Sequence, residues 1–85
     1  MWIITHDLLE NRTNIDIQSR DYDETMKNKL IHRFRLLDDD GEVYFEGLSD
    51  DCNSEKAFAP LDDFGEGYAG CTEIQYRLDD AWETL

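Results

Sequence analysis

The sequence predicts a small α+β domain, built on a mainly antiparallel β-sheet of four or five strands with one short helix or two. Three observations carry this prediction. The chain has 85 residues, of which 40% are hydrophobic and 12% aromatic, enough for a packed core but not for a large enzyme fold. Apolar and polar residues alternate in several short runs, as in half-buried strands. Asp-Gly and Asp-Asp pairs separate some of these runs, as tight turns do. A mostly-β fold is the alternative.

The alternating runs predict the strands in order. They are Ile15–Ile17, Leu30–Leu36, Val43–Phe45 and Thr72–Leu78. Asp40-Gly41 lies between the second and third runs and supplies the positive φ of a tight turn, which predicts a hairpin at about residues 30–48. Asp79-Asp80 predicts a second turn, followed by a short last strand over Trp82–Leu85.

Two segments favour helices. Ser54–Leu61 predicts one helical turn or two, with Ser54 as the N-cap and Pro60 at the end. A short helix over Asp21–Lys29 is compatible with the hairpin. The competing interpretation is a longer helix over Glu24–Leu37, because apolar residues also recur there at spacings of four, four and three. The Asp-Gly turn that follows directly favours the strand.

The charge is divided unevenly along the chain. Residues 1–37 carry six basic and six acidic side chains, whereas residues 38–85 carry two basic and fifteen acidic ones, so the formal charge of −13 lies in the second part. No linker rich in Pro, Gly or Ser separates the two parts. We therefore expect one compact domain over residues 1–85, with a neutral part (1–37) and a strongly acidic part (38–85).

Motifs that resemble functional loops fail in their context. Gly65–Gly70 spells GxGxxG, but no strand precedes it and a β-like run follows where a dinucleotide-binding fold needs a helix. We interpret it as a glycine-rich loop before a strand. Asp38–Gly41 does not fit a calcium loop, because Gly47 stands where a bidentate Glu is required. The sequence thus predicts no catalytic residue, no metal, no cofactor and no enzymatic activity.

The cysteines, the histidines and the N-terminus show no pattern of a zinc site or of a secreted protein. His6, His32, Cys52 and Cys71 include no closely spaced ligand pair, as structural zinc sites need. The N-terminus lacks the basic and apolar regions of a signal peptide and the length of a membrane span. We therefore expect a cytoplasmic protein without membrane contact, whose two cysteines are free thiols.

The acidic residues are the candidate partner-binding site. Most stand in pairs or triplets soon after a leucine, so that the chain leaves the core, turns and presents carboxylates. Repulsion among so many uncompensated charges destabilises a small domain, which favours a functional reason for them. The candidate residues are Asp38, Asp39, Asp40, Glu42, Glu46, Asp50, Asp51, Asp62, Asp63, Glu66, Asp79 and Asp80.

In size, charge, compactness and lack of catalytic motifs, the chain resembles the small acidic inhibitors of phages and plasmids. These are the nucleic-acid mimics among anti-CRISPR and anti-restriction proteins. The resemblance implies a non-enzymatic inhibitor that binds the basic, nucleic-acid-binding surface of a bacterial defence complex, without binding nucleic acid itself. The alternative is an acidic adaptor or regulatory protein that binds a basic partner without mimicry. Mutual repulsion predicts a monomer.

Crowding of the carboxylates also predicts how they titrate. Each negative neighbour disfavours ionisation, so we expect their pKa values to be raised in the folded state. Stability would then increase as the pH falls from neutral toward roughly 5, and it would increase with added salt.

Overall fold

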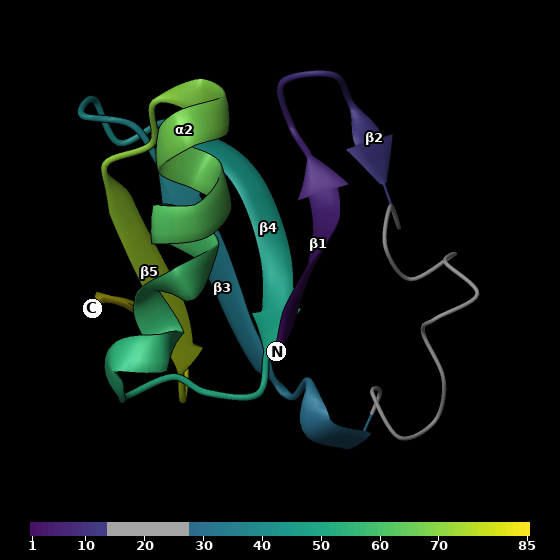
Figure 1. Cartoon of the computed structure of the whole chain (residues 1–85), viewed down its shortest axis with the longest axis vertical. Helices are drawn as coiled ribbons and strands as arrows, with labels where there is room; N and C mark the ends of the chain where they lie inside the picture. The colour runs from purple at the N-terminus through teal and green to yellow at the C-terminus, as the bar shows by residue number, and fades with distance from the viewer. Residues whose placement is uncertain (14–27) are drawn as a thin grey trace.

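The computed structural model describes residues 1–13 and 28–85, which form one antiparallel sheet with a helical segment on one face (Figure 1). The strand order is β2-β1-β4-β3-β5-β6. Five strands have four residues or more, so the predicted α+β class is confirmed, and β2 adds a pair of residues at one edge. The strands are β1 (Trp2–Asp7), β2 (Arg12–Thr13), β3 (His32–Leu37), β4 (Val43–Ser49), β5 (Glu73–Leu78) and β6 (Ala81–Thr84).

The predicted hairpin is the centre of the sheet. β3 pairs with β4, and Phe34 lies opposite Gly47. The turn closes through a hydrogen bond of 3.0 Å from the Asp38 backbone N–H to the Glu42 carbonyl, and Gly41 adopts the expected positive φ of 82°. Alternation and turn chemistry agree here, which is why local sequence was sufficient.

The C-terminal part of the sheet also follows the prediction. β5 and β6 form a second hairpin in which Arg77 lies opposite Trp82, and Asp79 in the turn has a φ of 55°. The expected strand at Ile15–Ile17 lies outside the described residues, as does the expected helix over Asp21–Lys29 except for its last two residues. The competing helix over Glu24–Leu37 is wrong for its C-terminal part, because residues 32–37 form β3 and only residues 28 and 29 of its described part are helical.

Strand β1 was not predicted. Its sequence is a continuous run, in which Ile3, Ile4 and Thr5 are all buried, whereas the prediction relied on alternation. The register between β1 and β4 shifts between Ile4 and His6, so a bulge further disturbs the period of two. The partner of β1 is β4, some forty residues away, and no local pattern indicates that pairing.

The helical segment is longer than predicted. Ser54 is the N-cap as expected, accepting a hydrogen bond from the Lys56 backbone N–H at 3.2 Å. Pro60 does not end the helical segment. It stands directly before the turn that begins at Leu61, and proline is tolerated at the start of a helix. The segment has three parts, η1 (Glu55–Phe58), η2 (Leu61–Gly65) and α2 (Glu66–Ala69).

The loop expected at Gly65–Gly70 is therefore wrong, since all but its last residue are helical. Gly70 ends α2 with a φ of 72°. Gly65 is required by packing, because a Cβ there would lie 2.8 Å from Cδ1 of Leu36 on β3. Aromatic and aliphatic side chains at helical spacing, such as Leu61 and Phe64, pack onto the sheet and draw this stretch into a helix.

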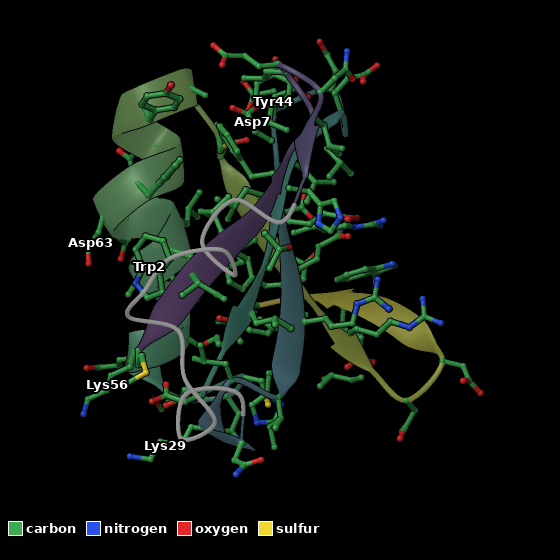
Figure 2. All side chains as sticks on the ribbon, turned by 90° about the vertical axis from the view of Figure 1, so that its right-hand side faces the viewer. Trp2, Asp7, Lys29, Tyr44, Lys56 and Asp63 are labelled. Carbon is green, nitrogen blue, oxygen red and sulfur yellow. The ribbon has the colours of Figure 1, made fainter. Side chains whose placement is uncertain are left out.

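The core fills the space between the helical segment and one face of the sheet. Phe34, Leu36, Phe45, Ile74 and Tyr76 are almost completely buried there. Figure 2 shows the helical segment on one side of the sheet only. No helix among the described residues covers the other face, which we call the open face. None of the described helices is long and apolar enough to cross a membrane.

Candidate functional site

The structure divides the twelve predicted binding residues among several places. The β3–β4 turn holds four of them at one end of the sheet, and the chain just after β4 holds two at the other end. Three more are exposed on the helical segment, two lie in the β5–β6 turn, and one, Glu46, lies on the open face. In that order they are Asp38, Asp39, Asp40 and Glu42; Asp50 and Asp51; Asp62, Asp63 and Glu66; Asp79 and Asp80; and Glu46.

The helical segment connects two of these groups. At its start, Ser54 donates a hydrogen bond to the Asp51 carboxylate. At its end, the Cys71 backbone N–H binds the Gly65 carbonyl, and the next residue, Thr72, binds the Leu37 carbonyl beside the β3–β4 turn. Figure 1 shows the same arrangement, with α2 at the end of the sheet where that turn lies. We call the segment and the groups at its two ends the acidic side.

The acidic side consists of nine residues: Asp38, Asp39, Asp40, Glu42, Asp50, Asp51, Asp62, Asp63 and Glu66. Figure 2 shows Asp63 pointing away from the sheet, with Lys56 lower on the same outer side. Glu46 does not belong to this surface, because it alternates with the buried Phe45 and Gly47 on β4. The twelve candidate residues therefore do not lie on one surface.

Few of these charges are neutralised by the residues that the structure describes. Among the described residues the structure has one ion pair, of 3.1 Å, between the N-terminal ammonium group and Asp50. The carboxylates of Asp62, Asp63 and Glu66 are exposed and take no part in it. These groups are available to a positively charged partner.

Two carboxylates of the acidic side stabilise turns. Asp38 accepts hydrogen bonds from the Tyr44 hydroxyl at 2.7 Å and from the backbone N–H groups of Asp40 and Glu42 at 2.9 Å, which lower its pKa. Asp51 accepts from the Ser54 hydroxyl and from two backbone N–H groups, so its pKa falls to about 2. Both side chains therefore have a structural role in a turn, whereas the sequence predicted that they bind a partner.

The expected increase in carboxylate pKa is wrong for these groups. A third carboxylate, Glu73, also has a lowered pKa, because it accepts hydrogen bonds from Thr84 and Gln75. In each case donors in direct contact with the carboxylate favour the charged form. Charge counting could not show this, since the donors are turn backbone groups and cross-strand side chains.

The open face carries a cluster that the sequence analysis missed. Arg33 and Arg35 of β3 and Arg77 of β5 gather around the indole of Trp82 on β6. Their guanidinium carbons lie 5.7, 4.4 and 5.8 Å from the ring centroid. We call these three residues the arginine cluster. Two features of the sequence indicate this cluster. Arg33 and Arg35 alternate with core residues, and the predicted turn at Asp79-Asp80 brings Trp82 back beside Arg77.

A hollow of about 170 Å³ lies beside this cluster on the open face. Arg33 belongs to both, and Thr5, His6, Glu46, Leu48 and Trp82 also line the hollow. The Thr5 hydroxyl lies 2.8 Å from Nδ1 of His6 and donates to the Glu46 carbonyl at 3.1 Å. The polar groups of this wall are thus held in place by the β1–β4 pairing.

The cysteines and histidines form no recognisable centre in the described part of the chain. Cys71 is buried and Cys52 half-buried, and both are free thiols. Burial raises the pKa of the Cys71 thiol to about 11, which makes it a poor nucleophile. No group of three or more His, Cys, Asp or Glu side chains within residues 1–13 and 28–85 is arranged to hold a metal ion.

Comparison with known proteins adds no relative. No protein-family model matches the chain, and no curated protein or solved structure is significantly similar to it.

Proposed function

We propose that this chain is a non-enzymatic acidic inhibitor that binds the basic, nucleic-acid-binding surface of a bacterial defence complex, in the manner of a nucleic-acid mimic. The observation that carries the proposal is the set of exposed carboxylates on the helical segment, Asp62, Asp63 and Glu66, which have no ion-pair partner among the described residues. The turn residues Asp39 and Asp40 extend this charge at one end of the segment.

The physical basis is charge complementarity with a surface that binds phosphates. Duplex DNA presents one negative charge per ~1.7 Å of its axis, and its binding proteins match these charges with Lys and Arg. Carboxylates fixed on a helix and on tight turns offer negative charge at low cost in conformational entropy. The formal charge of −13 would also speed the encounter with a basic partner at low salt.

The alternative function is an acidic adaptor that binds a basic protein surface away from any nucleic acid. One observation favours it. Asp38 and Asp51 are engaged in turns, so fewer carboxylates are available on the acidic side than the charge alone indicates, and a smaller basic patch would satisfy them. In both cases we propose a cytoplasmic monomer.

Competition separates the two functions. The partner is first captured from bacterial lysate at low salt and released at high salt, then loaded with labelled DNA, and the protein is titrated in. Displacement of the DNA supports mimicry, whereas a stable ternary complex of partner, DNA and this protein contradicts mimicry and favours the adaptor.

Two matched variants locate the contact. The first, Asp62→Asn, Asp63→Asn and Glu66→Gln, removes three charges from the helical segment and should weaken displacement strongly. The control, Asp79→Asn, Asp80→Asn and Glu83→Gln, removes the same charge from the β5–β6 hairpin. If both variants displace the DNA equally well, the site does not lie on the acidic side. An equal weakening in both would show that net charge alone matters.

A further inference from the structure

The arginine cluster has the wrong sign of charge for the proposed contact with a basic partner, so it needs a separate explanation. Its three guanidinium groups surround one indole, with Arg35 closest at 4.4 Å. Each cation is attracted to the ring, but the three groups also repel one another. A negative group placed near the cluster would relieve this repulsion.

Among residues 1–13 and 28–85, no carboxylate forms an ion pair with the arginine cluster. Arg35 donates from Nε to the neutral Oε1 of Gln75 at 2.7 Å. Glu46 lies opposite Arg35 in the strand register, and Arg35 contributes to the lowered pKa of Glu73, but neither carboxylate forms an ion pair with it among the described residues. Without an ion pair to the described part of the chain, the cluster can attract an external anion.

The hollow beside Trp82 offers a place for such an anion. Arg33 lines it and is exposed, so its guanidinium group can reach both the hollow and solvent. Leu48 and the indole of Trp82 supply an apolar wall. A ligand that fits this lining combines one negative group with a compact apolar body of a few carbon atoms.

The surrounding charge favours an anion that carries a single negative charge. The formal charge of −13 repels a ligand in proportion to the ligand's own charge, and Glu46 adds repulsion within the hollow itself. Nucleic acids and phosphate dianions are disfavoured on both grounds. We propose that the hollow beside Trp82 binds a small monocarboxylate with a compact apolar body, and that Arg33 binds its carboxylate group.

The test titrates isocaproate into the full chain and follows the amide NMR spectrum. We expect saturable shifts at the residues that line the hollow, with an affinity in about the millimolar range for so small a ligand. The neutral isostere isohexanol, which has the same carbon skeleton, should bind at least about tenfold more weakly because it lacks the charge that Arg33 recognises.

A pair of variants tests the role of Arg33. Arg33→Gln should weaken isocaproate binding about tenfold or more, whereas Lys56→Gln, which removes a positive charge from the helical segment, should leave it unchanged. Thermal melts check that both variants fold, and the acid–alcohol comparison needs no variant. Equal binding of acid and alcohol, tighter binding of inorganic phosphate than of isocaproate, or shifts confined to other residues would each overturn the proposal.

Discussion

Gly47 gives the sharpest test of how the sheet is packed. It lies at the centre of β4, opposite Ile4 on β1 and Phe34 on β3. A Cβ at this position would lie 2.2 Å from the carbonyl oxygen of Ile3 and 2.4 Å from Cζ of Phe34. The carbonyl belongs to a paired strand and cannot move away without disturbing the β1–β4 ladder. Gly47→Ala is therefore expected to destabilise the fold.

The size of the effect follows from known overpacking costs. Forcing an extra group into a packed core costs typically about 1–3 kcal/mol, and two clashes, one of them with backbone, place Gly47→Ala near the upper end. A loss of about 3 kcal/mol lowers the melting temperature of a domain of this size by about 12–24 °C. Circular dichroism during heating, together with urea denaturation, measures both quantities.

Gly67 provides the matched control. A Cβ there meets no heavy atom within 4 Å, and the residue lies in α2, where alanine is favoured over glycine by about 0.5–1 kcal/mol. Gly67→Ala should leave the melting temperature unchanged or raise it slightly. A Gly47→Ala chain that melts within a few degrees of the native protein would refute the described packing of β4 between β1 and β3.

Three further predictions concern titration and hydrogen bonding. The pKa of Asp51 is lowered to about 2 in the folded state, so its contribution to stability is present above the unfolded pKa of about 4 and is lost as the pH falls through 2. Thermal melts at decreasing pH should show this loss of stability in the native chain and a smaller loss in Asp51→Asn. Equal pH profiles of the two proteins would contradict the lowered pKa. Cys52 should react with a thiol reagent at pH 8 much faster than Cys71, whose pKa is about 11, and two equally fast thiols would argue against the burial of Cys71. Tyr76→Phe removes the buried hydrogen bond of 2.7 Å to the Ala57 carbonyl and should cost about 1–3 kcal/mol in urea denaturation; an unchanged midpoint would mean that water or another donor replaces the hydroxyl.

The sequence alone determined the elements whose causes are local. The β3–β4 hairpin follows from alternation on both sides of an Asp-Gly pair, and the β5–β6 hairpin follows from alternation before Asp79-Asp80. The N-cap at Ser54 is equally local, because its side chain binds a backbone group two residues ahead. These features need no knowledge of distant residues, and the structure confirms them.

Elements that form through contacts with distant residues depend on the tertiary structure. β1 is a strand because β4 offers it a free edge, and the helix continues beyond Pro60 because the sheet offers an apolar face to Leu61 and Phe64. The positions of the acidic groups followed from the same packing, which put Glu46 on the opposite face from Asp63.

The arginine cluster shows the same division most clearly. The sequence contains Arg33, Arg35, Arg77 and Trp82, but Arg33 and Trp82 are more than forty residues apart. Charge counting places the first two arginines in the neutral part of the chain and Arg77 in the acidic part. The pairing of β3 with β5 and the β5–β6 hairpin bring the three guanidinium groups within 6 Å of the Trp82 ring centroid. Periodicity determines which face of a strand a residue occupies, but only the order of strands in the sheet determines its neighbours across that face.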